Sequence, residues 1–434
     1  MRSLKALTLA FLLATGVHAP AAAQKASRSE AKAAAAEVAR LVARDYVYEA
    51  RRAPLVHALK TAPVTGESVD AREFAESLTL RMRAVSPDKH LRMSWSPDEY
   101  RRLAAEQRPS SGPTSAEAGR WAVEARRSHH GISDQRLLAG NVRIVRITDF
   151  WWEAGSREAL ERAVAFLQDA DALIIDLRGN GGGSPEAVQF LISHFMPADT
   201  LLMTARAPSG KTEQRRSLAV PPGRSLGGRP LFVLVDGVVG SAGEEFAYHV
   251  AQFRLGRLVG STTDGAANHN ALYAIAPGFV LSLSVASPTH PVSGGNWEGT
   301  GVPADVPAAP GQEEAVAHVL ALESLRDAAQ GSDRTGIEWA LEGARAALKP
   351  YQPTTAELQA AAGSYEDRQL AYADGSLIYR RPDRTDVRLR PLARGLFQLG
   401  STETRLRLVD GPRPSAIELS YSDGTVRRFA RAPR

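Results

Sequence analysis

The feature that most constrains the fold is an alternation of apolar runs and amphipathic segments in the middle of the chain. Two runs, Ala172–Gly179 and Pro230–Gly237, are almost continuously apolar and end in turn residues, which is typical of strands buried on both faces. Each precedes a segment in which apolar residues recur at helical spacing. This order predicts parallel βαβ units and therefore an α/β core. The strands are expected at 141–150, 172–179, 230–237, 256–260 and 278–286, and the helices at 156–170, 184–196 and 244–253.

Segments of different character flank this core. After Pro353, short alternating runs are separated by Asp-Gly, Arg-Gly and Gly-Pro turns, which predicts a small antiparallel all-β domain. Before the core, two segments carry helical apolar faces made of Val38, Leu41 and Val42, and of Phe74, Leu78 and Met82. The predicted organisation is a signal peptide at 1–23, a helical N-terminal domain at 24–105, the core at 106–330, a helical linker at 331–352 and the all-β domain at 353–434.

The N-terminus has the order of a secretory signal. Arg2 and Lys5 precede the apolar run Ala6–Val17, and small residues follow up to Ala23. This pattern predicts cleavage near Ala23 and export to the periplasm or the exterior. The run is too short to span a bilayer, and no later stretch reaches about 18 apolar residues, so no membrane span is expected.

The composition excludes several classes of function. The chain has 434 residues and no cysteine, which excludes disulfides and cysteine catalysis. Its formal net charge is +5, but the basic residues are scattered and form no nucleic-acid signature, so nucleic acid is not an expected partner.

A glycine cluster directly follows the apolar run 172–176. Gly179, Gly181, Gly182 and Gly183 lack the Lys-Ser/Thr of a phosphate P-loop, and Ser184 stands where a dinucleotide fingerprint needs its last glycine. The cluster is either a flexible turn or a nest of backbone amides that binds negative charge. In the second interpretation, the amides of Gly181 and Gly182 bind a phosphate, a carboxylate or the oxyanion of an acyl-transfer intermediate.

Ser241 occupies the same topological position after the next buried run. With Glu244 it forms a Ser-x-x-Glu capping box, which is a sufficient structural explanation. However, ligands of open α/β sheets bind at the carboxyl ends of the strands, so Ser241 is also a candidate nucleophile, with the amide of Ala242 as an oxyanion donor. The nucleophile-elbow motif is not met because Val239 replaces its first glycine.

A nucleophilic serine needs a base and a group that orients the base. The candidate bases are His90, His129, His130, His269 and His290. The candidate acid is Glu298, which lies in a glycine-rich loop beside Trp297. Sequence spacing alone does not join these residues.

Three stretches, 172–183, 233–252 and 284–306, in this order and spacing, resemble the tail-specific or carboxyl-terminal-processing serine peptidases. The resemblance is strongest to the branch that contains the tricorn core and the repeats of interphotoreceptor retinoid-binding protein. It implies a crotonase/Clp-like α/β core, Ser241 as the nucleophile, and an oxyanion hole formed by the glycine loop and Ala242. The family's PDZ module has no convincing counterpart here.

The same resemblance selects among the candidate bases. Thr262 stands where one branch of the family has the lysine of a Ser–Lys dyad, so that dyad is not expected. Asp88-Lys89-His90 matches the stretch that supplies the histidine of the tricorn-like branch, and Trp297-Glu298-Gly299 matches the stretch that supplies its glutamate. The tricorn pattern has a residue with a hydroxyl group just before the histidine, whereas this chain has Lys89 at that position.

The resulting hypothesis is an exported serine peptidase with a relay of Ser241, His90 and Glu298 and an oxyanion hole of backbone amides. Its substrate would be a peptide or an unfolded protein, with no cofactor and no metal. Three alternatives remain: a catalytically degenerate protein that binds an apolar ligand, an acyl-transfer enzyme acting on a CoA thioester, which the export signal disfavours, and an interaction protein that acts through its β-domain. The sequence assigns neither oligomeric state nor cleavage preference.

Overall fold

The computed structural model describes residues 24–105, 115–400, 402 and 404–433. The predicted signal peptide lies outside the described residues. The chain divides into two compact units. The first consists of residues up to Ser111 together with Asn270–Val285, and the second of Gly112–His269 together with Ala286–Arg434.

The first unit is mainly helical, and its helices begin at strong capping residues. Ser27 and Glu30 form a capping box at the start of α1, and the Asp70 side chain accepts hydrogen bonds from two amides at the start of α3. The apolar faces expected in this region, including Val38 and Leu78, are buried in one core. The helices are α1 (Arg28–Asp45), α2 (Glu49–Lys60), α3 (Ala71–Val85) and α4 (Pro97–Ala105), and β1 (Lys25–Ser27) pairs with β2 (Ser68–Asp70).

The second unit contains the predicted α/β core, so the predicted fold class is confirmed. Its six-stranded sheet has the order β13-β10-β9-β6-β5-β4, in which only the β4–β5 pair is antiparallel. The strands are β4 (Ile132–Leu138), β5 (Val142–Ile147), β6 (Ala172–Asp176), β9 (Leu231–Val235), β10 (Arg257–Gly260) and β13 (Val306–Pro307).

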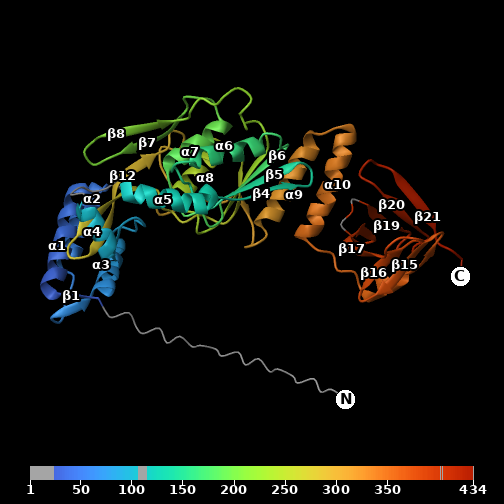
Figure 1. The fold of residues 1–434 in the computed structure, drawn as a ribbon, viewed down its shortest axis with the longest axis horizontal. Helices are drawn as coiled ribbons and strands as arrows, with labels where there is room; N and C mark the ends of the chain where they lie inside the picture. The colour runs from blue at the N-terminus through green and yellow to red at the C-terminus, as the bar shows by residue number, and fades with distance from the viewer. Residues whose placement is uncertain (1–23, 106–114, 401, 403, 434) are drawn as a thin grey trace, which may run out of the picture. The chain divides into compact units, whose positions relative to one another are not determined.

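Helices cover both faces of this sheet (Figure 1). Every residue of β6 and β9 is buried, and successive residues of β6 alternate between two cores: Leu173 and Ile175 enter one, and Ile174 the other. The first core contains residues of α6 (Ser156–Leu167), α7 (Pro185–Ile192) and α8 (Ala242–Gln252), and the second contains residues of α9 (Glu313–Ala328) and α10 (Gly331–Leu348). The segment expected as a linker at 331–352 therefore contributes a helix to the core, through Leu341 and Ala344.

One apolar run has a different role from the one expected. The run 278–286 was predicted to close the parallel series, but it lies in the antiparallel strand β12 (Phe279–Thr289). In the first unit, Phe279–Ser282 pairs with β3 (Arg92–Trp95), and β12 also neighbours β11 (His269–Ile275). In the second unit, Ser287–Thr289 pairs with β7 (Leu201–Arg206), whose other neighbour is β8 (Thr212–Arg216).

The C-terminal region is the expected antiparallel all-β domain. After α11 (Thr355–Ala361), eight strands pair in sequential order around a core that includes Tyr365, Leu389, Leu406 and Ile417. The strands are β14 (Gly363–Tyr365), β15 (Arg368–Ala373), β16 (Ser376–Arg380), β17 (Val387–Ala393), β18 (Leu396–Leu399), β19 (Arg405–Val409), β20 (Ala416–Ser420) and β21 (Val426–Ala430). Among the described residues, no helix has the length and apolar character needed to span a membrane.

Candidate active site

Two loops meet where the neighbouring parallel strands β6 and β9 end. The glycine loop follows β6, and Ser241 follows β9 at the start of α8. The contact between them is close: a Cβ atom added to Gly182 would lie 2.8 Å from the Cβ of Ser241 and 3.1 Å from the amide nitrogen of Ala242. The expected juxtaposition of the glycine cluster with Ser241 is therefore present, and it requires glycine at position 182, where φ is +119°.

Ser241 has a strained backbone. Its φ of 49° and ψ of −118° lie in a region that residues with a side chain rarely adopt. Two hydrogen bonds hold this turn, from the Ser241 amide to Glu244 Oε2 at 3.0 Å and from the Gly240 amide to the carbonyl of Asn180 at 2.9 Å. Such strain at the junction of a strand and a helix is a feature of sites that present a side chain for chemistry.

The three amides expected in an oxyanion hole differ in their hydrogen bonding. The Gly182 amide donates to Asn180 Oδ1 at 2.8 Å, whereas the amides of Gly181 and Ala242 have no acceptor among the described residues. Asn180 is fully buried and also donates to the carbonyl of Ile147 at 3.0 Å, so it fixes the glycine loop to the end of β5. Gly181 and Ala242 thus present the open amides beside Ser241. Sequence analysis did not identify the role of Asn180.

Glu244 is more than the helix cap that the sequence indicates. Its carboxylate is fully buried and accepts four hydrogen bonds, from the amide of Ser241, the hydroxyl of Thr263 (2.5 Å), the amide of Gly265 (2.6 Å) and the amide of Ala266 (2.8 Å). Burial raises the pKa of Glu244, and these four hydrogen bonds oppose the rise. The carboxylate therefore joins the start of α8 to the loop that follows β10.

Glu298 binds the next part of the same loop. Its Oε2 atom accepts from the amides of Ala267 at 2.8 Å and Asn268 at 2.9 Å, and its own amide donates to Asn296 Oδ1 at 2.9 Å. Four consecutive amides, those of residues 265–268, thus donate to the two carboxylates of Glu244 and Glu298. Through this segment, the Ser241 turn and the Glu298 loop belong to one hydrogen-bonded assembly.

His90 lies in the first unit, in a loop with a fixed backbone. Its amide donates to Asp88 Oδ1 at 3.0 Å, and its carbonyl accepts from the Ser282 hydroxyl at 2.6 Å. Asp88 is buried and also accepts from the Tyr46 hydroxyl at 3.0 Å. Because Ser241 and Glu298 lie in the second unit, the meeting of the three side chains stays a prediction.

Thr262 is exposed. Of the other candidate bases, His130 contacts the Ser156 hydroxyl at 3.0 Å through Nδ1, and His290 is completely buried.

Comparison with known proteins finds a match to one family model, mostly within the second unit. Residues 141–308 match the model of peptidase family S41. Ser241, Glu298 and the three predicted oxyanion donors lie inside the matched range, and His90 lies before it.

Several solved structures share part of the arrangement at low sequence identity. A photosystem II D1 C-terminal processing protease is 17% identical, with 67% of this chain and 97% of that chain covered and a TM-score of 0.44. A lipoprotein from Streptococcus agalactiae is 15% identical, with coverage of 66% and 95% and a TM-score of 0.42. The tricorn protease is also 15% identical, with coverage of 65% and 34% and a TM-score of 0.41.

His249 of α8 packs against His290 in the second unit, and both histidines are fully buried. The rings of His249 and His290 have centroids 5.3 Å apart, and the ring of Phe253 lies 4.6 Å from that of His290. Burial, with a smaller contribution from His249, lowers the pKa of His290 to about 4. The Nε2 atom of His249 lies 3.6 Å from Oε1 of Glu245. The same carboxylate oxygen lies 3.3 Å from a guanidinium nitrogen of Arg215.

Substitution of Glu244 by Gln should destabilise the second unit. The amide of Gln has one acceptor oxygen, so its NH₂ group would face donors that the carboxylate now satisfies. We expect the free energy of unfolding to fall by roughly 2 to 4 kcal/mol, measured by urea denaturation. The control is Glu338→Gln, at an exposed i,i+4 pair with Arg334, which should change stability by less than about 0.5 kcal/mol. Equal effects of the two substitutions would contradict this role for Glu244.

The free energy of unfolding should fall as the pH is lowered from about 6.5 to about 4. The unfolded chain protonates His290 near its ordinary pKa of 6.5, whereas the folded protein protonates it only near 4, so acid favours unfolding across that window. His290→Asn keeps an acceptor for the Val292 amide and removes the titration. Denaturant midpoints measured at pH 7, 6, 5 and 4 should show a smaller acid-induced loss for His290→Asn than for the wild type or for the exposed control His57→Asn. Parallel pH profiles for all three proteins would refute the assignment.

Proposed function

We propose that this protein is an exported serine peptidase in which Ser241 attacks the carbonyl carbon of a peptide bond. The observation that carries the proposal is the strained Ser241 turn, packed against Gly182 and flanked by the open amides of Gly181 and Ala242. A capping role alone requires neither the strain nor the close glycine contact. The matched family of serine peptidases supports the same chemistry.

The open amides are suited to an oxyanion. In the tetrahedral intermediate, the former carbonyl oxygen carries a negative charge, and preorganised amides stabilise it. Ala242 is the first residue of α8, where the helix dipole also favours negative charge. The Gly182 amide belongs to the proposed hole as well, and its hydrogen bond with Asn180 keeps the glycine loop in place.

In this mechanism His90 is the general base. It takes the proton of the Ser241 hydroxyl during attack and returns it to the leaving amine. Glu298 holds the relay, directly or through a water, and favours the charged imidazole that forms. Two amide hydrogen bonds orient the Glu298 carboxylate, and the contact with Asp88 fixes the His90 backbone. A lysine base is not part of the proposal, because Thr262 occupies the corresponding position.

The proposed substrate is a peptide or an unfolded protein outside the cytoplasm. The mechanism uses side chains and backbone amides throughout and requires neither a metal nor a cofactor. The N-terminal sequence pattern supports export to the periplasm or the exterior.

Labelling by a fluorophosphonate probe tests the relay. The wild type should react, Ser241→Ala should not react, and His90→Ala should react about 100- to 10,000-fold more slowly, because a general base contributes about that much. The matched controls are Ser261→Ala and His57→Ala, which change exposed residues and should label like the wild type.

Two outcomes would decide against this mechanism. Labelling of Ser241→Ala at the wild-type rate would remove Ser241 as the nucleophile. An unreactive wild type that copurifies with an apolar molecule would favour the alternative of a degenerate binding protein on the same fold.

A further inference from the structure

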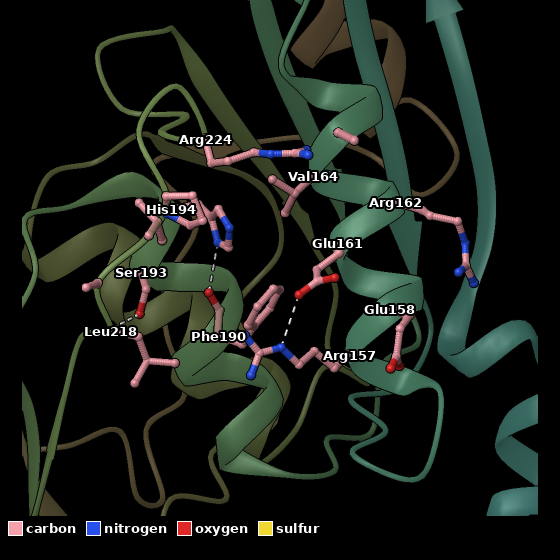
Figure 2. Close-up of a pocket in the computed structure, with 14 residues that line it drawn as sticks. Arg157, Glu158, Glu161, Arg162, Val164, Phe190, Ser193, His194, Leu218 and Arg224 are labelled. Carbon is pink, nitrogen blue, oxygen red and sulfur yellow. Dashed lines mark hydrogen bonds and ion pairs between the residues drawn. The ribbon is translucent and has the colours of Figure 1, made fainter.

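A cavity of about 470 Å³ lies in the second unit, between α6, the C-terminal end of α7 and the segment 218–224. Figure 2 shows the side chains of Val164, Phe190, His194 and Arg224 around it. None of the residues that line it belongs to the Ser241 turn or the glycine loop. A concave site of this size, with apolar walls and a few polar groups, is typical of small-molecule binding.

The walls are mainly apolar. Phe190 and Val164 are buried members of the core beside the cavity, while Leu218 from the opposite segment is 39% exposed. Ala165, Val220 and Pro221 extend the same lining. Such a surface suits a hydrocarbon body. A peptide would bring an amide N–H and a carbonyl per residue, and the apolar walls supply few partners for them.

Three arginines and two glutamates line the cavity, Glu158 among them, so its charged side chains leave one positive charge in excess. Arg157 is compensated by Glu161, which accepts from its Nε at 3.1 Å, and its guanidinium lies 5.5 Å from the centroid of the Phe190 ring. Arg224 donates to the neutral side chain of Gln168 at 3.0 Å, so its charge is not compensated there. Arg162 lies on the rim, but its guanidinium points away from the cavity in Figure 2.

His194 adds a neutral polar group. Its Nδ1 lies 3.0 Å from the carbonyl of Phe190, which only accepts, so Nδ1 carries the proton and Nε2 is an acceptor. Burial lowers the pKa of His194, which keeps the ring uncharged near neutral pH. The excess charge of the cavity therefore stays close to one, and Arg224 is the group that bears it.

We propose that this cavity binds a small organic acid with an apolar body, whose carboxylate pairs with the Arg224 guanidinium. The apolar body lies between Phe190, Val164 and Leu218. A guanidinium binds a carboxylate through two parallel N–H···O bonds, and Arg224 has donors beyond the one that Gln168 uses. Gln168 also donates to the carbonyl of Gly223 at 2.6 Å, so the arginine and its backbone are held by the same side chain. This assignment does not depend on the proposed peptidase mechanism.

Calorimetric titration of the purified full chain with 4-phenylbutyrate tests the proposal. A ligand of this size should bind with a Kd of roughly 0.1 to 1 mM. The neutral analogue 4-phenylbutyramide has the same shape and should bind at least about tenfold more weakly, because it lacks the charge-assisted pair. Both measurements use the wild-type protein, so they remain informative if a variant fails to fold.

Variants locate the site. Arg224→Gln should weaken 4-phenylbutyrate binding about tenfold or more, whereas Arg162→Gln, which removes a rim charge that points away, should bind within about twofold of the wild type. Ser241→Ala should bind like the wild type, which separates this cavity from the proposed active site.

Four results would overturn the proposal: no binding by the wild type up to 10-fold above the expected Kd, equal affinity for the acid and the amide, equal weakening by the two arginine substitutions, or loss of binding in Ser241→Ala. Tighter binding of an N-acetylated dipeptide that ends in phenylalanine would replace the free acid with a peptide C-terminus as the ligand.

Discussion

The geometry around Ser241 depends on one buried carboxylate. Glu244 accepts four hydrogen bonds, and three of the donors belong to the 263–266 loop, which is distant in sequence from the start of α8. A buried charge is tolerated only when its partners satisfy it, so the carboxylate and the 263–266 loop stabilise one another. Because the adjoining amides of Ala267 and Asn268 bind Glu298, the position of Glu298 follows from the same assembly.

This arrangement also reconciles the two interpretations of the Ser-x-x-Glu pattern. A strained residue such as Ser241 costs about 1 to 3 kcal/mol and persists only when its surroundings determine it. The bond from the Ser241 amide to Glu244 is half of a capping box, and it is one of the contacts that hold the strained turn. Capping and presentation of the hydroxyl are thus parts of one structure. The capping contact therefore supplies the rigidity that the proposed nucleophile would need.

The sequence predicted the parts of the fold that depend on local patterns. The strands β6 and β9 and their helices follow from apolar periodicity, and the meeting of the glycine loop with Ser241 follows from their parallel pairing. The run 278–286 was misplaced because a continuous apolar run has the same appearance in parallel and antiparallel strands. The hairpin of β7 and β8 was not predicted, since the residues of β8 are polar and mostly exposed.

The sequence analysis missed the roles of two residues near Ser241 for a different reason. Apart from their local bonds with Gly182 and Ser241, the side chains of Asn180 and Glu244 bind partners 19 to 33 residues away, and no local pattern encodes such contacts. The cavity at Arg224 could not be predicted from the sequence either, because its lining side chains come from three separated segments.

In the second unit, the proposed nucleophile and oxyanion donors lie in the segments that follow β6 and β9, and the proposed orienting acid lies in the loop before β13. The proposed base, His90, lies in the first unit and outside the matched range 141–308. In the proposed mechanism, proton transfer would therefore require a residue of the first unit, whereas stabilisation of the oxyanion would require residues of the second unit only. Loss of the proposed base should therefore leave the proposed oxyanion donors intact, because those donors are backbone amides of the second unit.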